Sequence, residues 1–132
     1  MQVITTHFNA DFDCLASMVA VQKLYPSARM VFPGSLEKAT QNFLSRHGQV
    51  FHFSRIKEID LDSVNLLVVV DTQDPGRIGL FESILGKPGL EIHVYDHHMD
   101  VVKKIPASKA VVCKRGSSAT VLFEILSAQA IS

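Results

Sequence analysis

The chain has 132 residues, of which 47% are hydrophobic, and its 13 Lys and Arg balance 13 Asp and Glu, so its formal net charge is zero. This length fits one domain with a substantial core, and the balanced charge lacks the basic excess of a duplex-binding surface. Cys14 and Cys113 lack the spacing of a paired-cysteine zinc site. The sequence has neither a signal peptide pattern nor an apolar run long enough for a membrane span, so we predict a cytoplasmic protein.

Apolar, β-branched runs alternate with helical patterns along the chain. Strands are predicted at residues 2–6, 29–32, 50–53, 65–71, 90–96 and 109–113. Helices are predicted at residues 13–25, 36–47, 75–85 and 117–128, the first with Asp13 as a candidate cap and Pro26 as its end. Strands that are apolar on both faces are typical of a parallel sheet between helices. The sequence therefore predicts an α/β fold, a three-layer sandwich with a mainly parallel central sheet of about five strands.

Polar side chains gather where three of the predicted strands end. In chain order they are His7, Asn9, Asp11, Asp13, Asp71, Asp96, His97 and His98. Because ligands bind at the carboxyl ends of strands in parallel sheets, we expect these residues to form one site.

A site with so many carboxylates and imidazoles is electrostatically unfavourable without a cation. Carboxylates mixed with imidazoles suit manganese, iron, cobalt or zinc, and carboxylate-rich sites suit manganese or magnesium. A carboxylate such as Asp71 can bridge two ions about 3.5–4 Å apart, an arrangement used in phosphoryl chemistry. The pattern therefore predicts a divalent metal site that acts on a phosphate.

Each of these residues, taken alone, also has an ordinary explanation. Asp13 could serve only as a helix cap, Asp71 as a turn residue, and His7 as a hydrogen-bonded polar residue. Cys14 opens an apolar helix and is predicted to belong to the core rather than to act as a nucleophile. The coincidence of three clusters at three strand ends is what favours the metal site.

A candidate anion site lies near the end of the chain, where Arg115 precedes Ser117. The start of the helix predicted at 117–128 could bind a phosphate through its backbone N–H groups. An ordinary serine cap explains the same residues equally well.

The three clusters together resemble the motifs of the DHH phosphoesterase family. The family's His-x-Asn-x-Asp-x-Asp motif is matched at 7–13, and its strand ending in Asp-Thr is matched at Asp71 and Thr72, with Arg77 and Gly79 following. The Asp-His-His motif stands at 96–98, and the resemblance extends from Val3 to Leu126. The stretches VITTHFNADFDCLASMVA and VFPGS resemble the first domain of bacterial proteins in which CBS domains and a poly(A) polymerase or tRNA nucleotidyltransferase domain follow.

The resemblance implies a phosphoesterase with two manganese ions, with magnesium or cobalt as alternatives. It implies that His7 and Asp11 hold one ion, that Asp13 and His97 hold the other, and that Asp71 bridges them. It also implies that His98 faces the phosphate, so that the catalytic group is Asp71, His97 and His98. Residues expected to support these ligands or contact substrate are Asn9, Arg77, Asp96, Arg115 and Ser117. The implied partner is a phosphate-containing small molecule or a short single-stranded nucleic acid.

The sequence departs from the family in two respects. Family members usually carry a further aspartate ligand and a second domain that closes over the substrate, and no aspartate follows Asp100. We therefore expect residues 1–132 to be a single DHH domain excised from a longer protein. A regulatory module that binds a nucleotide or metal without turnover, inside a multidomain nucleotidyltransferase, is the alternative. A phosphorylated receiver domain is a third hypothesis, but it gives no role to His7, His97 or His98.

Overall fold

The structure is a computed structural model that describes residues 1–47, 51–99 and 101–112. The predictions for Arg115, Ser117 and the helix at 117–128 lie outside the described residues. Within the described ranges, no helix has the length and apolar character needed to cross a membrane.

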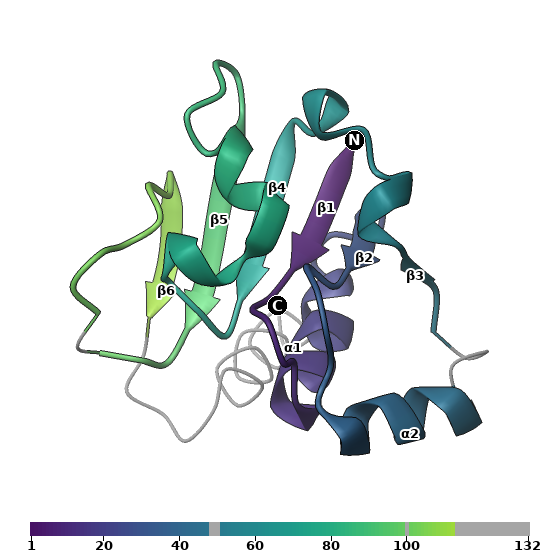
Figure 1. Cartoon of the computed structure of the whole chain (residues 1–132). Coiled ribbons are helices and arrows are strands. Elements are labelled where there is room, and N and C mark those ends of the chain that lie inside the picture. Colours follow the sequence, from purple (N-terminus) through teal and green to yellow (C-terminus); the bar gives the residue numbers. More distant parts are fainter. Residues whose placement is uncertain (48–50, 100, 113–132) are drawn as a thin grey trace, which may run out of the picture.

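One parallel sheet forms the centre of the molecule (Figure 1). Its strands are β1 (Gln2–Thr5), β2 (Arg29–Val31), β3 (Phe53–Ser54), β4 (Leu66–Val70), β5 (Glu91–Asp96) and β6 (Lys109–Val112). Their order is β3-β2-β1-β4-β5-β6, and every neighbouring pair is parallel. The predicted α/β fold is confirmed, with six strands where about five were expected. The chain winds outward from β1 in both directions, so the switch point lies between β1 and β4.

The sheet is buried on both faces, because alternate side chains of each strand enter different cores. Leu67 and Val69 pack on one side with Phe81, from the segment after β4. Val68 and Val70 pack on the other side with Met18 of the helix α1 (Phe12–Gln22). All four valine and leucine side chains of β4 named here are fully buried. This explains why the strand reads as a continuous apolar run.

The helix α1 begins one residue earlier than predicted, and its cap is Asp11 rather than Asp13. Asp11 has an extended backbone (φ −98°, ψ −172°), and its Oδ1 accepts a hydrogen bond of 3.0 Å from the Cys14 N–H. The prediction for Asp13 was wrong because a cap must precede the first turn, whereas Asp13 lies within it. The helix ends at Gln22, before Pro26, in a turn where the Leu24 N–H bonds to the Val21 carbonyl at 2.9 Å.

The remaining helices are short or lie at the sheet edge. The helix α2 spans Lys38–His47, starting two residues later than predicted, and the 3₁₀ turns η2 and η3 span Ile56–Glu58 and Leu61–Ser63. The α-helix predicted at 75–85 was wrong, because this segment forms the 3₁₀ helices η4 (Pro75–Arg77) and η5 (Gly79–Ile84). Gly79, the first residue of η5, has φ 61°, and a Cβ there would stand 3.0 Å from the Pro33 carbonyl oxygen. A left-handed residue cannot continue an α-helix.

Candidate metal centre

The turn after β1 carries the first cluster of predicted residues. Thr6 Oγ1 donates to the Val70 carbonyl at 2.8 Å, which ties the end of β1 to the end of β4. Asn9 adopts a left-handed conformation (φ 54°), and its Oδ1 accepts a hydrogen bond of 2.8 Å from Ser35 Oγ. This bond gives Asn9 a role in holding the loop that follows His7.

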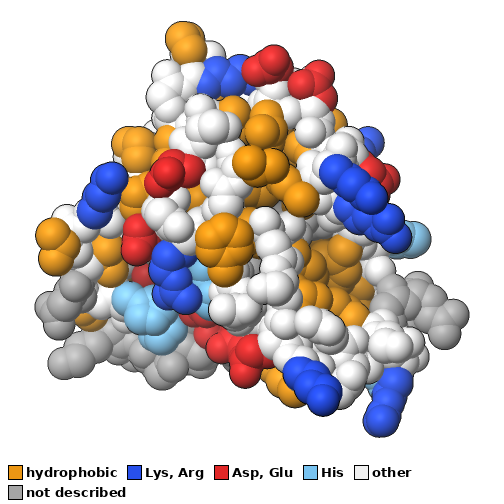
Figure 2. Space-filling view, viewed as in Figure 1, with side chains coloured by type: hydrophobic (Ala, Val, Ile, Leu, Met, Phe, Trp, Pro, Cys, Tyr) orange, Lys and Arg blue, Asp and Glu red, His pale blue; other side chains and the backbone are white. Residues whose placement is uncertain are grey.

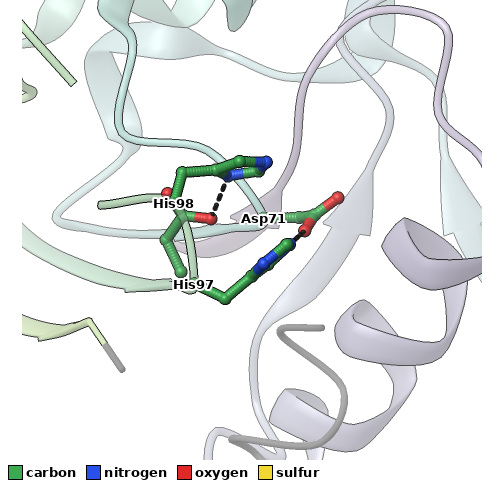
Figure 3. Close-up of side chains that lie close together, drawn as sticks. Asp71, His97 and His98 are labelled. Atoms are coloured by element: carbon green, nitrogen blue, oxygen red, sulfur yellow. Dashed lines mark hydrogen bonds and ion pairs between the residues drawn. The ribbon is translucent and has the colours of Figure 1, made fainter. Parts of the chain in front are cut away.

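Asp71 lies at the centre of the site, directly after β4. It is 4% exposed and has φ 65°, a left-handed conformation that is uncommon outside glycine and that clusters at functional sites. Its Oδ2 lies 3.3 Å from His7 Nε2, and its Oδ1 lies 3.1 Å from His97 Nε2. Figure 3 shows His97 reaching this carboxylate. Each oxygen of Asp71 therefore faces an imidazole from a different strand end.

The hydrogen bonds of His7 define which ring nitrogen faces Asp71. His7 Nδ1 lies 2.6 Å from the Phe8 carbonyl oxygen, so Nδ1 carries the donated proton. Burial by itself lowers the pKa of His7, but the bonds to Asp71 and to the Phe8 carbonyl outweigh it and leave the pKa above its usual value. Nε2 is therefore the ring nitrogen that faces Asp71, as in a metal-ligating histidine whose other nitrogen donates to a carbonyl.

The Asp-His-His motif begins where β5 ends. Asp96 is the last residue of β5, and His97 and His98 follow outside the strand. Strand alternation therefore does not separate the two rings, whose centroids lie 4.2 Å apart. His98 Nδ1 donates to Asp96 Oδ1 at 2.7 Å, and Asp96 is fully buried. This places Asp96 behind His98, which itself is exposed.

Gln73 is a residue of this turn that the sequence did not reveal. Its Nε2 donates to Asp96 Oδ2 at 2.9 Å and to the His98 carbonyl at 2.6 Å. The backbone carbonyl of Gln73 accepts a hydrogen bond of 2.8 Å from the Ile105 N–H. Gln73 is 6% exposed, so these contacts are shielded from water. They fix the second carboxylate oxygen of Asp96 and close the loop that follows the motif.

Replacing Gln73 by alanine should lower the free energy of unfolding by about 1–3 kcal/mol, because a buried carboxylate oxygen loses its hydrogen-bond donor. Urea unfolding measures this change. Gln41→Ala is the matched control, since Gln41 is exposed and its Nε2 donates only to the Leu36 carbonyl among the contacts described for that side chain. The control should change stability by less than about 0.5 kcal/mol. Equal effects of the two substitutions would contradict the role given to Gln73.

The described site residues line one open cavity of about 440 Å³. Its lining consists of His7, Asp11, Asp13, Asp71, Arg77, His97 and His98. Figure 2 shows histidine side chains gathered with acidic and basic side chains on the lower part of the molecule. A second hollow of about 630 Å³ shares Arg77 and His98 with this cavity and also borders Asp96. The structure thus brings together seven of the predicted residues, with Asp96 behind them and Asn9 in the adjoining loop.

Two groups of side chains have donor atoms close enough to hold a metal ion. One group is Asp71, Asp96, His97 and His98, and the other is His7, Cys14 and Asp71. Cys14 is fully buried, as predicted for a core residue, but its Sγ also lies 3.1 Å from His7 Nε2. The donor atoms are imidazole nitrogens, carboxylate oxygens and one sulfur, a set that fits a divalent cation.

Comparison with known proteins places the chain in a family. Residues 2–131 match the family described as "DHH family, N-terminal domain". The chain belongs to the DHH family. This membership and the contacts of His7 and His97 with Asp71 leave no support for the receiver-domain hypothesis.

Two relatives of this DHH domain differ in what they share with it. An A-adding tRNA nucleotidyltransferase of Geobacter sulfurreducens is 46% identical over 132 residues, which are 99% of this chain but 15% of that protein. An exopolyphosphatase-related protein of Bacteroides fragilis has a solved structure with a TM-score of 0.75, at 14% identity, over 96% of this chain and 38% of its own. The second likeness concerns the fold.

Proposed function

We propose that this domain is a metal-dependent phosphoesterase that holds two divalent cations, on either side of Asp71. The observation that carries the proposal is the buried Asp71 carboxylate, whose oxygens face His97 and His7 at 3.1 and 3.3 Å. Manganese is the proposed metal, with magnesium or cobalt as alternatives, because the cavity lining offers the carboxylates of Asp11, Asp13 and Asp71, and carboxylate oxygens suit manganese. The substrate is a phosphoester or phosphoanhydride of a nucleotide, short oligonucleotide or polyphosphate.

The ligands divide between the two sides of Asp71. His7 and Asp11 would hold one ion, and Asp13 and His97 the other. His7 Nε2 faces Asp71, because Nδ1 donates to the Phe8 carbonyl. These contacts support the fit of the site to a cation, since an imidazole beside a carboxylate stands where a bound ion would meet both.

The side chains around the ligands can bind and orient a phosphate. When bound, the ions would supply an activated water and neutralise charge on the phosphate. The Nδ1–H of His98 donates to the buried Asp96, which leaves Nε2 for a phosphate oxygen. The exposed guanidinium of Arg77 lines both hollows and offers charge-assisted hydrogen bonds to further phosphate oxygens.

Hydrolysis of a panel of substrates, followed by chromatography of the nucleotide products and by release of inorganic phosphate, tests this function. The panel consists of short oligonucleotides, pyrophosphate, polyphosphate and cyclic dinucleotides, each incubated with the protein and manganese. We expect turnover of one class that stops when the metal is chelated. Manganese binding without turnover of any class would contradict the hydrolase assignment for this domain.

A second candidate function is favoured by one of the relatives. The chain is 46% identical to a tRNA nucleotidyltransferase, and the matched region makes up only 15% of the length of that protein. In this alternative the domain is a regulatory module of a longer nucleotidyltransferase and binds a nucleotide or short single-stranded nucleic acid without turnover. Measuring ligand binding by calorimetry in parallel with the panel separates the two functions. Binding that is never followed by product favours the regulatory module.

A further inference from the structure

Three donor atoms of different chemistry meet on one side of Asp71. Cys14 Sγ lies 3.1 Å from His7 Nε2 and 3.2 Å from Asp71 Oδ2. The third side of this triangle, between His7 Nε2 and Asp71 Oδ2, measures 3.3 Å. The three residues come from the end of β1, the first turn of α1 and the end of β4, and all are buried.

The distances between these three donor atoms are close to the distances between ligand atoms around one metal ion. Zinc lies about 2.0–2.1 Å from nitrogen or oxygen and about 2.3 Å from sulfur, so tetrahedral ligand atoms are separated by roughly 3.3–3.6 Å. The observed separations of 3.1–3.3 Å need to open by only a few tenths of an ångström.

The start of α1 holds Cys14 in this place. Asp11 caps the helix by accepting the Cys14 N–H at 3.0 Å, which fixes the backbone of Cys14 in the first turn. The Cys14 thiol donates a hydrogen bond of 3.2 Å to Asp71 Oδ2. A bound cation would replace the thiol proton, which would leave to solvent as the metal–sulfur bond forms.

We propose that Cys14 is an additional ligand of the ion that His7, Asp11 and Asp71 would hold, and that this position prefers cobalt or zinc to manganese. Thiolate and imidazole ligands favour these softer ions, whereas carboxylate oxygens favour manganese. The two sides of Asp71 would therefore differ in metal preference, since the described donors on the His97 side are nitrogen and oxygen atoms. This inference rests on the proposed metal site.

Cobalt titration of the metal-free protein tests the proposal. Cobalt bound by a thiolate has a sulfur-to-metal charge-transfer band in the near ultraviolet, and we expect this band in the wild-type protein and in Cys113→Ser. Cys14→Ser should lose the band, and its affinity for zinc should fall by at least about 10- to 100-fold, more than its affinity for manganese. Retention of the band in Cys14→Ser would overturn the proposal.

A second measurement does not depend on the folding of a variant. X-ray absorption of the wild-type protein loaded with zinc should show a sulfur neighbour at about 2.3 Å. Cobalt or zinc binding with only nitrogen and oxygen neighbours would overturn the role of Cys14 and leave the proposed metal site intact. If calorimetry detects no binding of cobalt, zinc or manganese, both proposals fail.

Discussion

Asp71→Asn is expected to abolish manganese binding, with a loss of affinity of at least about 100-fold. The substitution removes the negative charge whose two oxygens face His7 and His97. Loss of a side chain that only supports a ligand already costs about 10–100-fold in affinity, and Asp71 is proposed to contact both ions directly. Asparagine tolerates the left-handed backbone at this position and has nearly the same volume, so the fold should persist. Isothermal titration with manganese measures the effect.

A matched control for this substitution is Asp60→Asn. Asp60 is exposed, caps η3 by accepting the Asp62 N–H at 3.1 Å, and does not line the metal cavity. Asparagine is an equally good cap, so manganese affinity and stability should stay unchanged. Undiminished manganese binding by folded Asp71→Asn would rule out Asp71 as the shared ligand.

His98→Ala is expected to lower turnover of the substrate identified in the panel by about 10²–10⁴-fold, the range for loss of a positioned proton donor or acceptor. Manganese affinity should change little, because His98 is proposed to face the phosphate rather than an ion. The reason is structural: the bond of 2.7 Å to Asp96 holds its ring at the cavity, beside but separate from the contacts of His97 with Asp71. Steady-state kinetics and manganese titration on the same preparation provide the two readouts.

His52→Ala controls for the loss of a histidine as such. His52 is exposed and does not line the metal cavity, so the variant should keep both turnover and manganese affinity. A His98→Ala variant that loses metal binding as strongly as turnover would assign His98 to a metal ligand instead.

The proximity of the site residues could be predicted, because it follows from the topology of the sheet. The apolar run of β4 predicts a strand buried on both faces, and parallel strands bring their carboxyl ends to one edge. Asp71, His97 and His7 therefore meet, although His7 precedes Asp71 by 64 positions and His97 follows it by 26. The exit of His97 and His98 from β5 also agrees with the expectation that they follow the strand.

The features that escaped prediction depend on contacts between distant segments. Ile78, Phe81 and Ile84 repeat every three residues, and over so short a segment this spacing fits an α-helix as well as a 3₁₀-helix. The left-handed backbone of Gly79, where a side chain would meet the Pro33 carbonyl from a separate part of the chain, is not visible in this spacing.

The contacts of Gln73 with Asp96 and of Cys14 with Asp71 could not be predicted, for the same reason. Gln73 reaches across 23 residues to Asp96, and Cys14 reaches across 57 residues to Asp71. Neither residue lies in a local pattern that distinguishes a site residue from an ordinary turn or core residue. These contacts form only where the strand ends lie side by side in the folded chain.

The most direct test of this account is calorimetric titration of the purified protein with manganese at neutral pH. The account predicts a clear heat of binding that Asp71→Asn removes and Asp60→Asn retains. A wild-type protein that gives no heat beyond dilution would contradict the metal centre on which the proposed function rests.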